Sequence, residues 1–224
     1  MPEPENTICP LCDHTNVGPY HRDKVRDYRH CRTCDLVFVP RAQHLSAADE
    51  KAYYDLHDNQ PDDPGYRRFL SRLFTPLNER LGTHAYGLDF GCGPGPTLSV
   101  MFEESGHTVA LYDPYYVPDD TVLSAHYDFI TLSEVVEHMA EPGKELNRLW
   151  NSLKPGGLLG IMTKRVQGRD AFKTWHYITD PTHVAYFSER SFQWITERWT
   201  SMGAAAHLIV AGNDVVLIGK DRGA

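Results

Sequence analysis

The 224-residue sequence predicts an α/β protein in which a small four-cysteine module precedes an open, doubly wound, mostly parallel sheet. Apolar strands alternate with amphipathic helices over most of the chain, and a glycine-rich turn follows the first of these strands. Four of the five cysteines lie within the first 34 residues. The length suits one full α/β domain and one small module. We therefore expect three segments, at residues 1–40, 41–65 and 66–224.

The cysteine spacing predicts a structural zinc ribbon in the first segment. Two C-x2-C knuckles are separated by 18 residues. Each knuckle aims two sulfurs at one point, and two knuckles complete a closed tetrahedral shell with no open position for catalysis. The alternative is a pair of disulfides, which a cytoplasmic protein rarely forms. The expected ligands are Cys9, Cys12, Cys31 and Cys34.

Composition and charge exclude several classes of protein. No run of about 18 apolar residues is present, so we expect no membrane span. Met1–Glu5 has neither the basic nor the apolar part of a signal peptide, which favours the cytoplasm. The net charge is −8, and residues 9–41 carry six basic and four acidic side chains. Four thiolates around a zinc ion would bring that segment to about zero, so nucleic-acid binding is not expected.

The next stretch predicts a strand, a connector and a helix. The apolar residues Leu36–Pro40 indicate a short strand that packs against the following domain. Residues 41–65 have the composition of a connector, in which Tyr53 and Tyr54 either cover a ligand pocket or pack on the surface. Apolar residues at helical spacing predict a helix over 66–81 that is interrupted near Pro76.

The rest of the chain alternates between strands and helices and ends in a hairpin. Ser188 is the expected N-cap of the last helix, and Gly212-Asn213-Asp214 is the expected hairpin turn. A further helix is expected to begin at His138. The expected strands are 86–90, 107–112, a short one at 121–124, 127–132, 158–162, 205–210 and 215–219; the expected helices are 97–105, one across 146–153 and 188–202.

The most informative stretch is Leu88–Gly95, a strand that ends in a G-x-G-x-G turn. Glycine tolerates positive φ and lets the backbone approach a ligand closely. A strand, a glycine-rich turn and a helix form the nucleotide-binding corner of a Rossmann-like sheet. Pro96 stands where the dinucleotide pattern needs its third glycine, which argues against a dinucleotide oxidoreductase.

Four motifs in this order resemble the class I S-adenosylmethionine-dependent methyltransferases. They are the glycine turn, the acid that ends Ala110–Asp113, the stretch from Tyr127 to His138, and Leu153–Gly157. The closing hairpin fits the same family and differs from dehydrogenases. The resemblance implies S-adenosylmethionine as cofactor, and the binding residues it implies are Asp89, Gly91, Gly93, Gly95, Asp113, Pro114, Ser133 and Glu134.

Physical reasoning supports part of this set. Asp89 and the amides of Gly91 and Gly93 would hold the charged amino-acid end of the cofactor. Asp113, 22 residues past Gly91, would accept hydrogen bonds from both ribose hydroxyls, unless it is only an exposed turn residue. An acid for the adenine is not placed, with Asp119 and Asp120 as candidates, and Cys92 is expected to be a small buried filler.

Two stretches could handle the acceptor's proton. His138 follows the 127–132 strand, and a loop after the 158–162 strand carries His176, Asp180 and His183. Methyl transfer needs an aligned nucleophile and a base that removes its proton. Each histidine could instead have a packing role, Asp180 and His183 could simply hold the loop by hydrogen bonds, and the three loop residues could chelate a metal.

The sequence therefore predicts methyl transfer to a small-molecule or glycan acceptor, at an oxygen. The ribbon and the apolar strand after it are similar to the front ends of bacterial sugar and secondary-metabolite methyltransferases. One alternative is an RNA or protein methyltransferase that binds its substrate through the ribbon. Another is a non-catalytic module that binds the cofactor. The identity of the acceptor, the atom methylated and the oligomeric state are left open.

Overall fold

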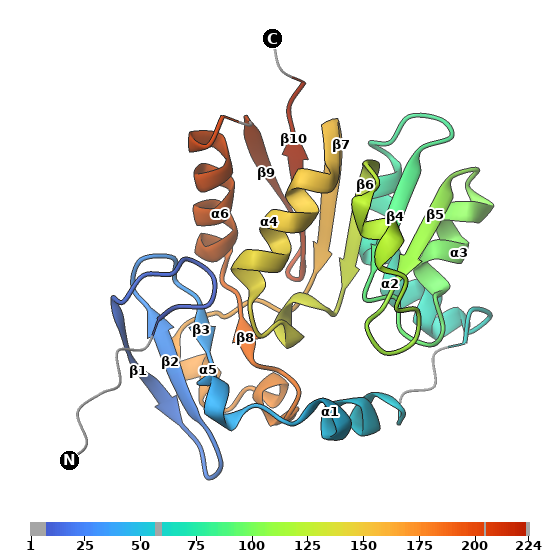
Figure 1. The fold of residues 1–224 in the computed structure, drawn as a ribbon. Coiled ribbons are helices and arrows are strands. Elements are labelled where there is room, and N and C mark those ends of the chain that lie inside the picture. Colours follow the sequence, from blue (N-terminus) through green and yellow to red (C-terminus); the bar gives the residue numbers. More distant parts are fainter. Residues whose placement is uncertain (1–7, 57–59, 204, 223–224) are drawn as a thin grey trace.

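The computed structural model describes residues 8–56, 60–203 and 205–222, which form two sheets (Figure 1). Met1–Glu5, where the sequence predicts no targeting signal, lies outside the described residues. None of the helices formed by the described residues combines the length and the hydropathy of a membrane-spanning segment.

The larger sheet has six strands in the order β5-β4-β6-β7-β10-β9. The first four pair in parallel, and β10 is antiparallel to both of its neighbours. This confirms the predicted doubly wound sheet with a closing antiparallel hairpin. The strands are β4 (Tyr86–Phe90), β5 (Thr108–Tyr112), β6 (Tyr127–Ser133), β7 (Leu153–Met162), β9 (Ala206–Ala211) and β10 (Val215–Lys220).

Helices cover both faces of this sheet (Figure 1). On one face α2 (Pro64–Asn78) and α3 (Thr97–Glu104) pack against Phe129 of β6. On the other, α4 (Pro142–Ser152) and α6 (Glu189–Ser201) pack against Ile130. Neighbouring residues of β6 thus point to opposite cores, because side chains alternate along a strand.

Capping explains where α6 begins, and packing explains why α2 continues past its proline. Ser188 accepts the amide of Ser191 in a capping box at the start of α6, as predicted. The helix α2 is not interrupted at Pro76 and ends at Asn78. Leu73 and Leu77, on either side of the proline, are fully buried, and this packing holds the last turn in place.

Three predicted boundaries were wrong. Thr121–Ser124 is not a strand, because the Asp119 carboxylate accepts the Thr121 amide at 3.0 Å and starts the 3-10 helix η2 (Asp120–Ser124). No helix begins at His138, which ends the 3-10 turn η3 (Val136–His138). The strand predicted at 158–162 begins earlier, because Leu153 already pairs with β6, and a register shift separates this pair from the next one at Leu158.

The smaller sheet joins the cysteine module to the rest of the chain. Its order is β1-β2-β3-β8, so its fourth strand comes from far along the sequence. Pairing of β3 with β8 confirms that the apolar strand after the last cysteine packs against the following domain. The strands are β1 (Val17–Arg22), β2 (Asp27–Cys31), β3 (Val37–Phe38) and β8 (Ala185–Tyr186).

The cysteine module is docked closely on α4 and α6. The Gly143 amide donates to the Pro10 carbonyl at 3.1 Å, and a Cβ at Gly143 would lie 2.3 Å from the Leu11 carbonyl oxygen. The Ser188 hydroxyl donates to Asp35 at 2.6 Å. The cysteines share one hydrophobic core with the strands of the large sheet, so no gap in packing separates the two parts.

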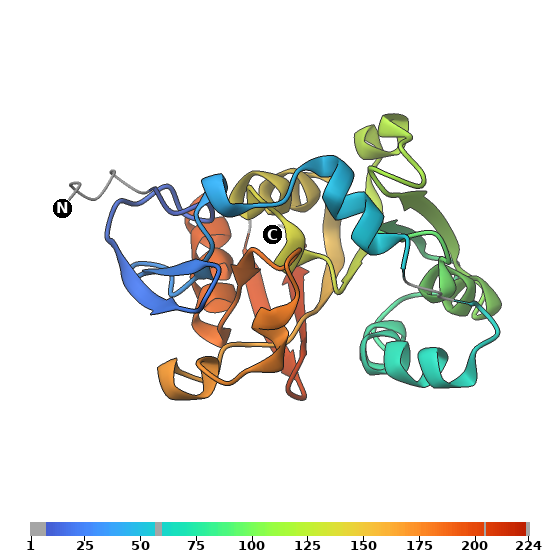
Figure 2. The same ribbon diagram turned by 90° about the horizontal axis from the view of Figure 1, so that it is seen from below.

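The connector contains helices of its own. The 3-10 turn η1 (Arg41–Gln43) leads into α1 (Ala47–Tyr54), and α2 begins within the last residues of the connector. Figures 1 and 2 show α1 lying across the edge of the large sheet where the parallel strands end. Two short helices, α5 (Arg169–Phe172) and η4 (His176–Thr179), follow β7 near the same edge.

Candidate active site

The glycine turn after β4 has the conformation that its residues predict. Gly91 and Gly93 have φ angles of 75° and 64°, in the left-handed region that favours glycine. A Cβ at Gly91 would lie 2.6 Å from Cγ2 of Val135, so this glycine is needed for packing. A Cβ at Gly93 would meet nothing within 4 Å, so the backbone there is open to a ligand.

The amides of these two glycines donate within the protein. Gly91 donates to the Tyr112 carbonyl at 2.7 Å, and Gly93 donates to the Asp113 carboxylate at 3.0 Å. These bonds hold the turn against the end of β5. A ligand bound beside Gly93 would therefore lie against an ordered turn, next to an Asp113 carboxylate that is already oriented.

Asp113 is buried and firmly oriented. Only 7% of its surface is exposed, which excludes the alternative of an exposed turn residue. Its second carboxylate oxygen accepts the amides of Tyr115 and Tyr116 at 2.8 and 3.1 Å. Pro114, beside it, is exposed. Asp113 thus presents a fixed carboxylate at the carboxyl end of β5, next to the glycine turn.

Asp89, near the end of β4, is a second buried acid. The Thr131 hydroxyl donates to it at 2.8 Å. Burial nevertheless raises the pKa of Asp89 to about 6, because the charged form is poorly solvated there. A cation beside Asp89 would stabilise the carboxylate. Gly95, further along the turn, is also buried.

Glu134 follows Ser133 at the end of β6 in a strained conformation. Its φ is 54°, unusual for a residue with a side chain, and its amide donates to the Met162 carbonyl at 2.8 Å. Burial raises the pKa of this carboxyl to about 7. The Tyr177 hydroxyl oxygen lies 3.4 Å from its Oε2. Strain of this kind is common at functional sites.

A cluster of Glu137, His138, His183 and Tyr177 lies at the same edge. The His138 and His183 rings are 4.7 Å apart, and the His183 and Tyr177 rings 4.1 Å. The Tyr177 hydroxyl donates to Glu137 through a short hydrogen bond. Burial, and then the charge of Glu134, raises the pKa of Glu137 to about 8. We predicted His138 and His183 as site residues but not Glu137 or Tyr177.

Of the other two predicted loop residues, His176 lies apart from this cluster and Asp180 lies beside it. His176 is exposed, with its Nε2 2.8 Å from Nζ of Lys164. Asp180 accepts the amide and the hydroxyl of Thr182 and lies 3.8 Å from Nε2 of His183. Among the described residues, the groups of possible metal ligands within 4.8 Å of one another include neither His176 nor Asp180. The predicted chelating trio is therefore not brought together.

The connector helix α1 covers this cluster. Tyr54 packs edge-on against the His138 ring at 5.3 Å and contacts Tyr115. Glu50 accepts the hydroxyls of both Tyr54 and Tyr115, at 3.0 and 2.6 Å. A cavity of about 50 Å³ below α1 is lined by Glu50, His138 and Thr182, among others. Of the two alternatives predicted for the connector tyrosines, Tyr54 therefore follows the first, because it covers the candidate site.

Arg26, on the β1–β2 hairpin, holds the loop that carries His183. Its guanidinium is buried and donates to four backbone carbonyls of that loop. The acceptors are the carbonyls of Ile178, Asp180, Pro181 and His183, the last at 3.0 Å. Nothing in the sequence around Arg26 distinguishes it from other surface arginines, so sequence reasoning missed it.

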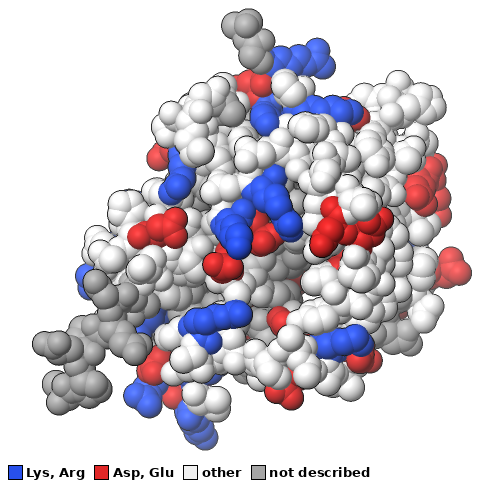
Figure 3. Space-filling view, in the orientation of Figure 1, with Lys and Arg blue, Asp and Glu red and all other residues white. Residues whose placement is uncertain are grey.

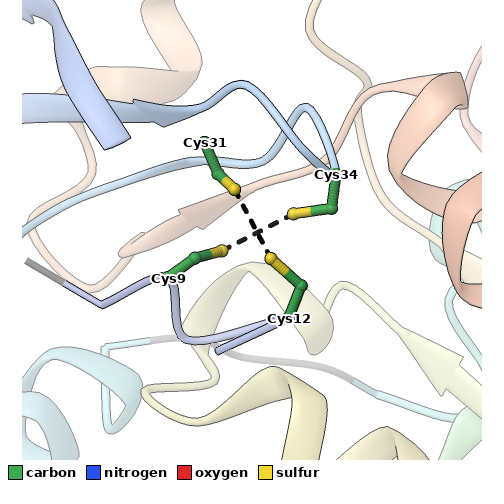
Figure 4. A group of neighbouring side chains, drawn as sticks. All are labelled: Cys9, Cys12, Cys31 and Cys34. Carbon is green, nitrogen blue, oxygen red and sulfur yellow. Dashed lines mark hydrogen bonds between the residues drawn. The ribbon is translucent and has the colours of Figure 1, made fainter. Parts of the chain in front are cut away.

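The four cysteines fit a zinc ion (Figure 4). All are free and buried, and their sulfurs lie within 4.8 Å of one another. Two of the distances are 3.5 Å (Cys9 to Cys34) and 3.4 Å (Cys12 to Cys31). A tetrahedral shell with Zn–S bonds of about 2.3 Å places its sulfurs roughly 3.8 Å apart. The absence of disulfides among these residues also disfavours the alternative pairing.

The raised pKa of Glu137 predicts that the stability of the folded protein depends on pH. In the folded protein Glu137 keeps its proton up to about pH 8, whereas an unfolded glutamate loses it near its ordinary value of 4.5. The folded state therefore binds more protons between these values, and stability falls as pH rises through this window. Glu137→Gln, which cannot ionise, is expected to reduce that fall by about 1–3 kcal/mol.

Urea denaturation at pH 5 and pH 8 measures this difference. Glu79→Gln, at an exposed position, is the matched control and is expected to leave the pH dependence as it is in the wild type. An equal loss of stability in the Glu137→Gln and wild-type proteins between the two pH values would contradict the assignment.

The fold and this site define a class of enzyme. A parallel sheet with a glycine turn after β4, an acid after β5 and a closing antiparallel hairpin is the architecture of class I methyltransferases. The family model described as "Methyltransferase domain" matches residues 62–199. The chain belongs to this methyltransferase family, which confirms the class predicted from the sequence.

Solved structures share the fold at low sequence identity. The 1,6-didemethyltoxoflavin-N1-methyltransferase of Burkholderia thailandensis, with bound 1,6-didemethyltoxoflavin and S-adenosylhomocysteine, is 18% identical, with a TM-score of 0.50 over 92% of this chain and 99% of that one. The magnesium protoporphyrin IX methyltransferase of Synechocystis PCC 6803, with bound SAH, is 14% identical, with a TM-score of 0.52 over 78% of this chain and 94% of that one. No curated protein matches the chain.

Proposed function

We propose that this protein transfers a methyl group from S-adenosylmethionine to an oxygen of a small-molecule or glycan acceptor. The observation that carries the proposal is the fixed Asp113 carboxylate beside the open Gly93 backbone. The residues that would hold the cofactor are Asp89, Gly91, Gly93, Gly95, Asp113, Pro114, Ser133 and Glu134.

The residues at this corner fit the chemistry of that cofactor. Asp89 is a buried carboxylate that a cation would stabilise, and the cofactor's amino-acid end carries an ammonium. Asp113 is a carboxylate at the end of the neighbouring strand, where two ribose hydroxyls could donate to it. When bound, the cofactor supplies a methyl group on a sulfonium, already activated for displacement.

His183 is the residue best suited to accept the proton that the acceptor loses. Burial lowers the pKa of His183, so the ring is neutral at pH 7. Its Nδ1 lies 2.8 Å from the Tyr177 carbonyl, which can only accept, so Nδ1 carries the hydrogen and Nε2 has the lone pair. Asp180 would stabilise the ring once it is protonated, and His138 lies beside it. Exposed His176 has no part in this proposal.

The docking of the ribbon favours a small acceptor. Pro10 and Asp35 each accept a hydrogen bond from the methyltransferase domain, and Arg26 donates to that domain. Figure 3 shows acidic and basic side chains interspersed on one face, without a continuous basic field. The ribbon thus supports the loop that carries His183 instead of extending as a separate arm. We also propose a cytoplasmic location, because four thiols gathered at one point suit a reducing compartment, where cysteines bind metal ions.

One observation favours a macromolecular acceptor as the second candidate. A groove of about 320 Å³ between the β1–β2 hairpin and α5 is lined by four basic side chains together with Tyr20 and Tyr28. The basic residues are Arg22, Arg29, Arg169 and Lys173. Such a groove could bind phosphate groups of RNA.

Labelling separates the two candidates. The protein is incubated with radiolabelled S-adenosylmethionine and cell extract, and the products are digested with nuclease or protease before fractionation. Label in a small soluble fraction that survives both treatments is the expected result. Label sensitive to nuclease or to protease would favour the macromolecular acceptor, and no label at all would favour a non-catalytic module.

The cofactor assignment has its own test. Asp113→Asn keeps the size of the side chain but removes the charge, and hydrogen bonds to a charged group contribute about 1.5–3 kcal/mol. We expect affinity for S-adenosylmethionine to fall about 10- to 100-fold in isothermal titration calorimetry. Asp221→Asn is the control, because this aspartate is exposed and follows β10 at the opposite edge of the sheet. Equal affinity of the Asp113→Asn and wild-type proteins would refute the ribose assignment.

A further inference from the structure

Glu137, His138 and His183 form a group whose ligand atoms lie within 4.8 Å of one another. Two of them follow β6 in the turn η3, and the third precedes β8. The Val184 amide donates to the Glu137 carbonyl at 2.8 Å and ties these two segments together. The group is separate from the four cysteines and is built from a carboxylate and two imidazoles.

Both histidine rings are held in the same way. Nδ1 of His183 lies 2.8 Å from the Tyr177 carbonyl, and Nδ1 of His138 lies 3.3 Å from the Thr182 carbonyl. A carbonyl can only accept, so each Nδ1 carries the hydrogen and each Nε2 has its lone pair. Histidines that bind metals commonly donate their other ring N–H to a backbone carbonyl in this manner, which fixes the ring for the ion.

The carboxyl group of Glu137 has one oxygen that is hydrogen-bonded and one that is not. The side chain is fully buried, and Oε1 accepts the Tyr177 hydroxyl. Its other oxygen, Oε2, is buried without a hydrogen-bond partner. A buried carboxyl oxygen without a hydrogen-bond partner is costly in either protonation state, and structures rarely retain one without a reason. A cation beside the two imidazoles would satisfy this oxygen.

We propose that Glu137, His138 and His183 bind a divalent transition-metal ion at the acceptor end of the site. One carboxylate and two imidazoles suit Mn²⁺, Fe²⁺, Co²⁺ or Zn²⁺. The inference rests on the proposed function, because the ion would act on the acceptor's oxygen. With the ion bound, the two Nε2 lone pairs hold it, and water takes the acceptor's proton in place of His183.

The ion's part in methyl transfer is that of a Lewis acid. It lowers the pKa of an acceptor hydroxyl, whose proton leaves to water. An oxygen electron pair forms the new bond to the methyl carbon, and the electron pair of the broken carbon–sulfur bond stays on sulfur. The positive charge of the sulfonium is thereby lost and the proton appears in solution, so charge and atoms balance.

Mn²⁺ binding to the zinc-loaded, full-length protein tests the site without an acceptor. Mn²⁺ prefers oxygen and nitrogen ligands and competes poorly for four thiolates, so zinc stays in the ribbon. Electron paramagnetic resonance follows free Mn²⁺ during the titration. We expect one equivalent to bind, and His138→Gln, at a half-buried position, to weaken binding about 10- to 100-fold.

His176→Gln is the matched control, because this histidine is exposed and lies outside the group. We expect it to keep the wild-type affinity for Mn²⁺. Glu137→Gln is the second variant, and the melting temperature of each variant shows whether it is folded. If His138→Gln does not fold, the number of Mn²⁺ ions bound by the wild type and the effect of Glu137→Gln on Mn²⁺ affinity still test the metal site.

Three results would overturn the inference. They are the absence of Mn²⁺ binding to the wild type, Mn²⁺ binding that survives both His138→Gln and Glu137→Gln, and Mn²⁺ binding lost in His176→Gln. S-adenosylmethionine binding is measured in parallel. Cofactor binding without metal binding overturns this inference and leaves the proposed function intact; metal binding without cofactor binding supports the site and contradicts the proposed function.

Discussion

Cys31→Ser is expected to lose the ribbon metal and, with it, the order of the loop that holds His183. A structural zinc contributes roughly 10–16 kcal/mol to the folding of a small module, and the first 40 residues have little core of their own. Because β3 pairs with β8, an unfolded ribbon would release one edge of the segment that follows His183. We therefore expect an effect far from the metal.

Hydrogen exchange measured by mass spectrometry checks this result. In the variant, exchange is expected to rise across residues 17–31 and across 176–186, while β4 and β6 stay protected. Cys92→Ser is the matched control, because this cysteine lies in the glycine turn and is absent from the four-cysteine group. Unchanged exchange in 176–186 after the metal has been lost would contradict the coupling between the ribbon and the loop.

Arg26→Ala is expected to destabilise the protein by about 3–5 kcal/mol, because hydrogen bonds to a charged group contribute about 1.5–3 kcal/mol each and are not additive. The substitution removes a charged donor from four loop carbonyls. The Ile178, Asp180 and His183 carbonyls keep one neutral donor each, which replaces the lost hydrogen bonds only in part. The loop holds both His183 and the Tyr177 carbonyl that orients its ring. We expect the His183 ring to lose its defined orientation.

Urea denaturation measures the loss of stability, and NMR of the histidine side chains reports on the ring of His183. Arg22→Ala, on the same hairpin, is the control, because Arg22 is exposed and lies 3.6 Å from Asp27. An exposed ion pair of this kind is worth about 0–1 kcal/mol. Equal stability of the two variants would show that Arg26 does not hold the loop.

The parts of the site that sequence reasoning predicted are local in the chain. Two C-x2-C knuckles and the G-x-G-x-G turn are short segments whose conformation depends on their own residues, and the structure has both as expected. Asp113 was predicted because the end of a strand next to the glycine turn has a known place in a parallel sheet. The helix N-cap at Ser188 depends likewise on neighbouring residues.

The missed residues depend on contacts between distant segments. Glu137 follows β6 and Tyr177 follows β7, so their hydrogen bond depends on how two loops pack. Arg26 reaches a loop more than 150 residues away in the chain. Tyr54 was left with two readings, since composition cannot say which way a connector folds. No pattern within a short stretch of sequence encodes these pairings.

The sequence by itself thus determined the class of fold and predicted both the cluster of four cysteines and the position of acids at the ends of β4 and β5, because short-range geometry and strand order place them. The tertiary structure alone decided which polar side chains lie together after β6 and β7. It separates His176 from His183, adds Glu137 beside the two histidines, and makes the ribbon a support for their loop. The physical reason is that burial and long-range hydrogen bonds, which exist only in the folded chain, select which of several polar side chains meet.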